Sequence, residues 1–258
     1  AIRWCASRSE CFINDTQARD HATRAAMAFD RDGKILALRV HGRCNMGAHV
    51  VPRQPNSTVG NIIRMLVGAY AVPEAYLDFK GYVTNTIPIN VYRGVGRFED
   101  IYVVERLMDS AALRFSLDRA EIRRRNLVKP SAMPFTTPTG GICDCGDFPR
   151  LMESALRYAG WAGFPARKAE AAKRGRLCGI GVVYTIEGAG GIAQEYAIAE
   201  AKPDGTIVVG IGSQSQGQGH ETTFAQLASE TLDVPFDKVR IIAGDTDRIA
   251  QGVGTFAS

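Results

Sequence analysis

The sequence predicts an α+β fold in which helices pack on mixed sheets. Two β-hairpins lie far apart in the chain, "AAMAFDRDGKILALRV" around a turn at residues 30–33 and "EYAIAEAKPDGTIVVGIG" around a turn at residues 203–205. Apolar residues alternate on both sides of each turn, and the turns contain the Asp, Pro and Gly residues that tight corners need. Helical periodicity fills the region between the hairpins. This order favours mixed sheets over a run of parallel βαβ units.

The longest predicted helix covers about 101–115, where apolar residues recur at three- and four-residue steps: Ile101, Val104, Met108, Ala111 and Phe115. Such spacing gives one apolar face. A second helix is predicted from Arg119, because Asp118 stands in the N-cap position and Glu121 in the capping-box position. This helix also carries three consecutive arginines, Arg123, Arg124 and Arg125. We expect them to face solvent or to pair with nearby acids.

Residues 129–146 contain three prolines and three glycines without periodicity and are the predicted linker between two lobes, 1–128 and 147–258. After it we expect a helix over 147–158, a second over 167–174 and a strand over 177–186. The 258 residues suffice for two ordinary domains. The ends of the sequence, "AIRWCASRSE" and "GVGTFAS", resemble the interior of a domain, so an internal part of a longer polypeptide is expected.

The composition argues against several classes of protein. The net charge is only +4, without a dense basic face, so nucleic-acid binding is not predicted. No apolar run reaches the ~20 residues of a membrane helix. The six cysteines form no CxxC pair, and the close pair Cys143 and Cys145 lacks a second pair to complete a zinc site. Free thiols in the reducing cytoplasm are therefore expected.

The stretch "GSQSQGQGHETT", residues 212–223, joins a predicted strand to a predicted helix with an apolar face at Phe224, Leu227 and Ala228. The start of a helix offers unpaired backbone N–H groups and the positive end of the dipole, which suits an anion such as phosphate. Glycines let the backbone approach closely, and glutamine amides both donate and accept. The alternative, that the glutamines only cap neighbouring backbone, is equally consistent with these residues.

Two further glycine-rich stretches carry charge. In "NVYRGVGRFED", residues 90–100, Arg93 and Arg97 flank two glycines, so a guanidinium could meet an anion there. The spacing is not that of the dinucleotide fingerprint, and the chain has no phosphate-loop motif. In "GDTDRIAQGVGTFAS", residues 244–258, Asp245 and Asp247 suggest either a metal loop or, more simply, a turn.

In this order, the stretches resemble the large, molybdopterin-binding subunit of the molybdenum hydroxylases, the family of xanthine dehydrogenase, aldehyde oxidase and carbon monoxide dehydrogenase. The resemblance covers nearly the whole chain. It is carried by "WCASRSECFINDTQARDH", "YRGVGRFEDIYVVERLMD", "EIRRRNLV", "SQGQGHETTFAQLASETL" and "GDTDRIAQGVGTFAS". It implies the molybdenum cofactor-binding fold of the aldehyde oxidase and xanthine dehydrogenase type, present here in part.

The resemblance implies a molybdopterin that holds molybdenum, in the cytosine dinucleotide form that is common in bacteria. It assigns contacts with this cofactor to Gln216, Gly217, Gln218, Gly219, His220, Thr222, Arg93, Gly94, Gly254, Ala257 and Ser258. It assigns the substrate pocket to Tyr92 and Val95. No residue of this chain is expected to ligate the metal directly.

The chain departs from the family pattern at several points. Carbon monoxide-oxidising members carry a copper-holding cysteine where this chain has Gly94, so copper-dependent oxidation is disfavoured. The family continues Arg–Pro–Glu where this chain has Arg97, Phe98 and Glu99, which predicts a shifted start for the next helix. A glycine–phenylalanine–glycine loop is expected before residue 1 and a general-base glutamate after residue 258. No catalytic residue is therefore assigned within this chain, and the chain by itself is expected to be inactive.

The complete enzyme would hydroxylate a small molecule, an aldehyde or an N-heterocycle, with water-derived oxygen. It would pass the electrons to FAD and iron–sulfur clusters on partner subunits, in a cytoplasmic dimer of heterotrimers. Two alternatives remain open: a non-catalytic phosphate- or nucleotide-binding module that uses the same loops, and a degenerate relative that keeps only the fold.

Overall fold

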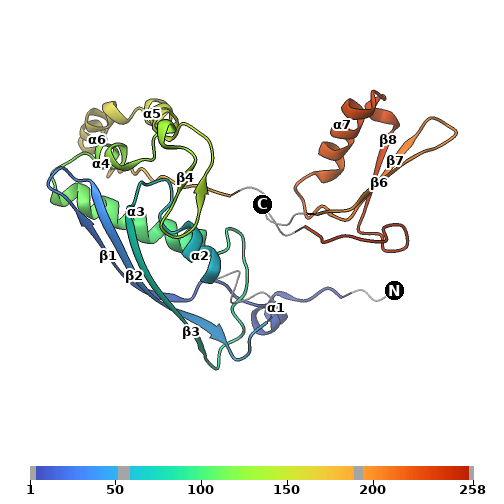
Figure 1. Ribbon diagram of the computed structural model, residues 1–258, viewed down its shortest axis with the longest axis horizontal. Helices are drawn as coiled ribbons and strands as arrows, with labels where there is room; N and C mark the ends of the chain where they lie inside the picture. The colour runs from blue at the N-terminus through green and yellow to red at the C-terminus, as the bar shows by residue number, and fades with distance from the viewer. Residues whose placement is uncertain (1–3, 52–58, 189–193, 256–258) are drawn as a thin grey trace. The chain divides into compact units, whose positions relative to one another are not determined.

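The computed structural model describes residues 4–51, 59–188 and 194–255 and divides the chain into two compact units, Ala1–Ile186 and Glu187–Ser258 (Figure 1). The units are described separately. The linker predicted over 129–146 lies inside the first unit, so the compact units divide later in the chain than the predicted lobes. The division into lobes at 129–146 stays a prediction.

The first unit contains a mixed three-stranded sheet, as the sequence predicts. Its strands are β1 (His21–Phe29), β2 (Ile35–Gly47) and β3 (Glu74–Val83), in the order β1-β2-β3. β1 pairs with β2 antiparallel, and β2 pairs with β3 parallel. The hairpin turn forms because Asp30 Oδ1 accepts hydrogen bonds from the N–H groups of Asp32 and Lys34 at 2.9 and 2.8 Å, while Gly33 supplies a φ of 76°.

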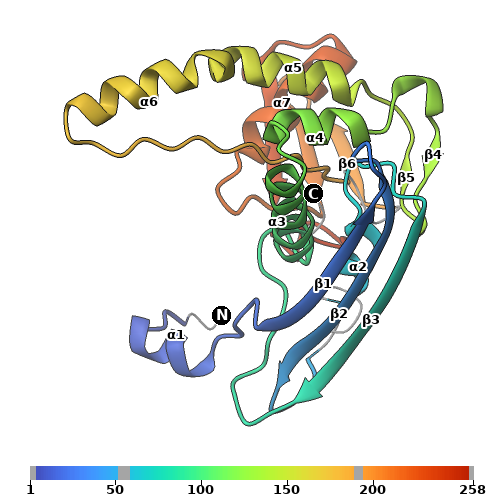
Figure 2. The same cartoon turned by 90° about the vertical axis from the view of Figure 1, so that its left-hand side faces the viewer.

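The helices of this unit are α1 (Arg8–Asn14), α2 (Gly60–Met65), α3 (Arg97–Arg114), α4 (Arg119–Asn126), α5 (Phe148–Tyr158) and α6 (Phe164–Lys173). The last four follow the predicted order, whereas α1 and α2 were not predicted. A short ladder, β4 (Phe135–Thr136) with β5 (Ile142–Cys143), lies between α4 and α5. In Figure 2, α3 is seen nearly end-on and lies beside one face of the sheet. α3 begins earlier than its apolar pattern suggests, because Gly96 with φ 81° ends the preceding turn.

The predicted N-terminal cap of α4 is confirmed for Asp118 and wrong for Glu121. Asp118 accepts from the N–H groups of Ala120 and Glu121, as an N-cap residue does. Glu121 does not complete the predicted capping box. Its carboxylate pairs instead with Arg124 and Arg125, because two guanidinium groups one turn away attract it more strongly than one N–H.

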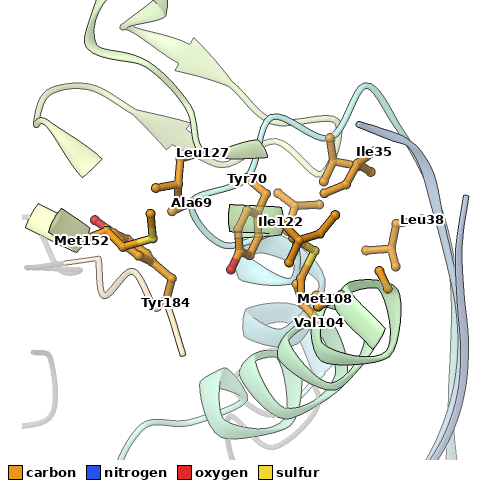
Figure 3. Close-up of a cluster of buried hydrophobic side chains, with 14 of the residues drawn as sticks. Ile35, Leu38, Ala69, Tyr70, Val104, Met108, Ile122, Leu127, Met152 and Tyr184 are labelled. Carbon is orange, nitrogen blue, oxygen red and sulfur yellow. The ribbon is translucent and has the colours of Figure 1, made fainter. Parts of the chain in front are cut away.

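The core of the first unit lies between the sheet and the helices. Ile35 and Leu38 of β2 face Val104 and Met108 of α3 (Figure 3). Further along, the cluster continues through Ile122, Tyr70, Leu127, Met152 and Tyr184. Apolar burial of this kind is the main stabilising contribution to the unit.

A buried ionic network ties α3 to α4. Arg123 is 0% exposed and pairs with Glu105 at 2.7 Å and with Asp109 at 2.9 Å, and the Tyr70 hydroxyl donates to Glu105. Burial raises the pKa of Glu105, while the charge of Arg123 opposes that rise. The predicted salt bridges of the arginine triplet are thus confirmed, but a solvated face is wrong for Arg123 because it lies inside the core.

The strand predicted over 177–186 is wrong. The segment pairs with no strand among the described residues, yet its side chains alternate, with Val182, Tyr184 and Ile186 packed against the core and Val183 64% exposed. Tyr184 also donates from its hydroxyl to the carbonyl of Phe148 at 3.0 Å. Buried and exposed side chains alternate in any extended segment that is covered on one side, whether or not its backbone pairs with a neighbouring strand.

The second unit places two loops at one sheet edge. Its strands are β6 (Ala197–Ala201), β7 (Ile207–Ile211) and β8 (Val239–Ala243), in the order β6-β7-β8. The predicted hairpin β6–β7 is confirmed, and β7 pairs with β8 parallel. Helix α7 (His220–Leu232) makes the crossover from β7 to β8. Because β7 and β8 are parallel, the loops that follow them, 212–219 and 244–255, leave from the same edge.

Within the ranges that the structure describes, every helix is too short or too polar to traverse a lipid bilayer.

Candidate cofactor-binding loops

The two loops at the carboxyl ends of β7 and β8 touch each other backbone to backbone. A Cβ on Gly212 would lie 2.4 Å from the Cα of Gly252, and a Cβ on Gly252 would lie 2.6 Å from the Cα of Gly212. Both distances are too short for any side chain, so glycine is required at both positions. This contact explains two of the glycines in stretches that the sequence presents only as flexible.

Glu195, which sequence analysis missed, joins both loops to the start of β6. Its Oε1 accepts from the N–H groups of Tyr196 at 2.8 Å and Val253 at 3.1 Å. Its Oε2 accepts from the Ser213 hydroxyl at 3.0 Å and from the N–H of Gly254 at 3.1 Å. These bonds, from Tyr196 first, lower the pKa of Glu195. In the sequence, nothing distinguishes this glutamate from other acids near the strand.

Gln218 holds the tip of loop 212–219. Its Oε1 accepts from the N–H of Gln216 at 2.6 Å, which is the capping role that the sequence left open as an alternative. The side chains of Gln216 and Gln218 are both exposed, so their amide NH₂ groups face solvent. Gly217 and Gly219 have φ values of 116° and 78°, and a Cβ at either would meet nothing within 4 Å. These glycines serve the backbone conformation, and the space beside them is open.

The start of α7 has no side-chain cap. Gly219 occupies the N-cap in the left-handed conformation, and the Thr223 hydroxyl bonds back to the carbonyls of Gly219 and His220 rather than forward to N–H groups. Thr222 is exposed. The ring of His220 packs, tilted by 44°, against that of Phe224 with the centroids 4.9 Å apart, and its buried Nδ1 has no partner among the described residues. The first two N–H groups of this 13-residue helix, those of His220 and Glu221, are thus open to an anion.

The loop after β8 begins with a turn. Asp245 Oδ1 accepts from the N–H of Asp247 at 3.1 Å, and the Asp245 carbonyl accepts from the N–H groups of Arg248 and Ile249. The described residues hold no cluster of three His, Cys, Asp or Glu that would bind a metal. The hydrogen bonds of Asp245 themselves form the turn that the sequence analysis favoured.

Further along, the Thr255 hydroxyl donates to the carbonyl of Gln214, which adds a second link between the loops. Gly254 has a φ of 93°, and its N–H is taken by Glu195, so its predicted cofactor contact would use other atoms. Ala257 and Ser258, also predicted to contact the cofactor, lie outside the described residues.

In the first unit, the turn before α3 is closed by Phe98, a residue that departs from the family pattern. A Cβ on Gly94 would lie 2.2 Å from the Phe98 ring, and Gly94 has a φ of 80°. Arg19 lies over both neighbouring rings, with its guanidinium carbon 4.3 Å from the Phe98 centroid and 5.1 Å from that of Tyr92. Arg19 also donates to the carbonyl of Arg93. The turn is therefore held without room for a side chain at position 94.

The predicted substrate residues Tyr92 and Val95 do line one cavity, but it measures only about 10 Å³, the space of one water. Tyr92 also lines a wider cavity of about 380 Å³ with Arg19 and Phe12. The part of the chain that the structure describes thus forms no pocket for an organic molecule between Tyr92 and Val95.

One buried acid near this turn was not predicted. Asp100 is 2% exposed, and neither carboxylate oxygen has a hydrogen-bond partner within the described ranges. Desolvation raises the pKa of Asp100 to about 8. Its position in the first turn of α3 resembles that of an ordinary capping acid in the sequence, so its burial could not be seen there.

Glycine-rich loops at the ends of parallel strands, beside an uncapped helix start, define a class of sites that bind phosphate-bearing cofactors. Comparison with known proteins identifies the family. The model of the molybdopterin cofactor-binding domain matches residues 1–127, and a second model with the same description matches residues 154–258.

Relatives agree with this match. The carbon monoxide dehydrogenase large chain of Afipia carboxidovorans is 33% identical, and the nicotine 6-hydroxylase large subunit of Paenarthrobacter nicotinovorans is 30% identical, each over 100% of this chain. The crystal structure of quinoline 2-oxidoreductase from Pseudomonas putida 86 superposes with a TM-score of 0.90 at 34% identity, covering 98% of this chain and 34% of that one. The chain belongs to the molybdopterin-binding family of the molybdenum hydroxylase large subunits. It spans about a third of these relatives, 34% and 33% of the two curated ones.

Proposed function

We propose that this chain holds molybdopterin in its cytosine dinucleotide form and that the complete protein is a hydroxylase of aldehydes or N-heterocycles. The observation that carries the proposal is the pair of joined glycine loops beside the uncapped start of α7. When bound, the cofactor would supply the two-electron oxidation, with oxygen derived from water. Electrons would pass on to FAD and iron–sulfur partner subunits.

The residues of the second unit fit a pyrophosphate-bearing cofactor by their chemistry. The N–H groups of His220 and Glu221 would bind the pyrophosphate, because they have no partner among the described residues and lie at the positive end of the helix dipole. The exposed amides of Gln216 and Gln218 would donate to pterin or phosphate oxygens. Gly217 and Gly219 leave open space for close approach. His220 and Thr222 are proposed as further contacts at the helix start, and Gly254, Ala257 and Ser258 as contacts from the other loop.

In the first unit, Arg93 and Gly94 are proposed as cofactor contacts and Tyr92 and Val95 as substrate contacts. The relatives named for nicotine and quinoline favour an N-heterocycle as the substrate class. Carbon monoxide is disfavoured despite the similarity to a carbon monoxide dehydrogenase chain, because Gly94 offers no thiol to hold copper, and Phe98 leaves no room for a side chain there.

The test is substitution of Gln218 in the complete protein, with molybdenum measured by elemental analysis. Gln218→Ala removes both the amide donor and the cap on Gln216, whereas Gln218→Glu keeps an oxygen for the Gln216 N–H but loses the donor and adds a charge that repels phosphate. We expect both variants to lower molybdenum occupancy. Gln226→Ala, at an exposed position in the middle of α7, is the control and should leave it unchanged.

Full occupancy in Gln218→Glu would mean that Gln218 only caps the loop, and the cofactor contact would then be rejected. Nucleotide retained without molybdenum in the unmodified protein would favour a phosphate- or nucleotide-binding module. Neither ligand would indicate a relative that keeps only the fold.

A further inference from the structure

We infer that Glu195 is a positioning residue that fixes the two cofactor loops against each other, an inference that rests on the proposed function of those loops. The carboxylate of Glu195 accepts hydrogen bonds from three separate parts of the chain. They are the N–H of Tyr196 just before β6, the Ser213 hydroxyl in loop 212–219, and the N–H groups of Val253 and Gly254 in loop 244–255. Among the described residues, the other side-chain hydrogen bond between the loops comes from Thr255, which reaches a single carbonyl, that of Gln214.

The carboxylate of Glu195 lies directly beside the contact between the loops. A Cβ on Gly212 would lie 2.4 Å from Glu195 Oε1, and the same Cβ would lie 2.4 Å from the Cα of Gly252. Glu195 is itself exposed, and its carboxylate lies against the point where the two glycine backbones cross. The two glycines allow the approach, and the carboxylate supplies the attraction that holds it.

The chemistry requires a carboxylate of this length. Both oxygens accept two bonds each, and only an ionised carboxylate offers acceptors on both of its terminal atoms. Glutamine would turn an NH₂ group toward N–H or O–H donors on one side. Aspartate is shorter by one methylene and would not reach Val253 and Gly254 from the same backbone position.

The consequence for the cofactor is preorganisation. Glycine-rich loops lose much conformational entropy when a ligand orders them. A loop pair already fixed by Glu195 has less entropy to lose, so the cofactor binds more tightly without touching Glu195 itself. Glu195 occupies the N–H groups of Val253 and Gly254, so these two donors are not offered to an anion, whereas those at the start of α7 are.

The test compares Glu195→Gln and Glu195→Asp with Glu200→Gln in the complete protein. Glu200 is an exposed acid on β6 that pairs with Lys202 and contacts neither loop, so it is the matched control. The first readout is amide hydrogen exchange by mass spectrometry. Peptides that cover 252–255 and 212–217 should exchange about tenfold faster in both Glu195 variants, the factor that one lost hydrogen bond carries. Unchanged exchange in β7 shows that the variants are folded.

The second readout is molybdenum occupancy. We expect it to fall several-fold in both Glu195 variants and to stay at the unmodified level in Glu200→Gln. Unchanged loop exchange would overturn the inference, and so would faster exchange with full molybdenum occupancy, because the loops would then not need Glu195 to hold the cofactor. Absence of molybdenum from the unmodified protein would contradict the proposed function instead. The hydrogen-exchange measurement would then still test whether Glu195 fixes the two loops against each other.

Discussion

Replacing Arg123 by alanine removes the guanidinium that ties α3 to α4. In the structure, Arg123 Nε donates to Glu105 at 2.8 Å, Nη2 donates to Asp109 at 2.9 Å, and Nη1 donates to the carbonyl of Arg119 at 2.9 Å. Glu105 is only 4% exposed, so after the substitution it would keep the Tyr70 hydroxyl as its remaining side-chain partner.

The size of the effect follows from that burial. Removing one partner of a buried ion pair costs about 3–5 kcal/mol, because the other charge is left desolvated and uncompensated. Arg124, next in the helix, is the control: its side chain is 41% exposed and pairs with Glu121 and Glu153 at the surface. Exposed pairs contribute about 0–1 kcal/mol. Arg123→Ala should therefore cost several times more unfolding free energy than Arg124→Ala.

Urea unfolding at neutral pH, followed by circular dichroism, measures both variants. The double variant Arg123→Met with Glu105→Gln should recover part of the loss, because it leaves no buried charge in the pair. If Arg123→Ala costs no more than Arg124→Ala, the buried network does not stabilise the α3–α4 packing as described.

Asp100→Asn should flatten the pH dependence of stability. The pKa of Asp100 is raised to about 8, so between about pH 4 and pH 8 the folded state keeps a proton that the unfolded state has released. In that range the unfolding free energy of the unmodified protein falls by up to about 1.4 kcal/mol per pH unit, and the variant should lose this slope. Equal slopes for variant and unmodified protein would contradict this. Gly94→Ala should lower the melting temperature, because position 94 has a φ of 80° and the new Cβ would lie 2.2 Å from the Phe98 ring. Adding Phe98→Ala should recover only the part of the loss that comes from the clash with the ring. An unchanged melting temperature for the single variant would refute the closed turn. Gly252→Ala should reduce molybdenum occupancy, since its Cβ would lie 2.6 Å from the Cα of Gly212, and full occupancy would show that the two loops need not touch.

The elements that the sequence predicts correctly are those with local causes. Both hairpins form where turn residues such as Gly33 and Gly205 take positive φ between alternating strands. The long helix α3 follows its apolar spacing, and α4 begins after its N-cap Asp118. In each case the pattern and its consequence lie within a few residues of each other, so the sequence alone carries the information.

What the sequence could not predict depends on contacts between distant segments. Arg123 looks the same as Arg124 in the sequence, and only the packing of α4 on α3 makes one buried and the other exposed. Glu195 precedes a strand like many surface acids, and its role arises because residues 213 and 253–254 fold back to it. The segment 177–186 alternates like a strand, but no ladder partner meets it among the described residues.

The candidate site was predicted in part for the same reason. The glycine loops and the helix start of α7 are local features and were found. Their joining through Gly212, Gly252 and Glu195 is a tertiary feature and was not. The sequence also left open whether the glutamines cap the backbone or bind a ligand, and Gln218 does cap Gln216 while its amide NH₂ remains exposed.

The most direct test of the account is the molybdenum and nucleotide content of the complete, unmodified protein. Elemental analysis would measure molybdenum per chain, and acid hydrolysis followed by chromatography would identify the released nucleotide. The account predicts molybdenum together with CMP, since the loops at the ends of β7 and β8 and the start of α7 suit a pterin with a nucleotide tail. Nucleotide without molybdenum, or protein free of both, would contradict it.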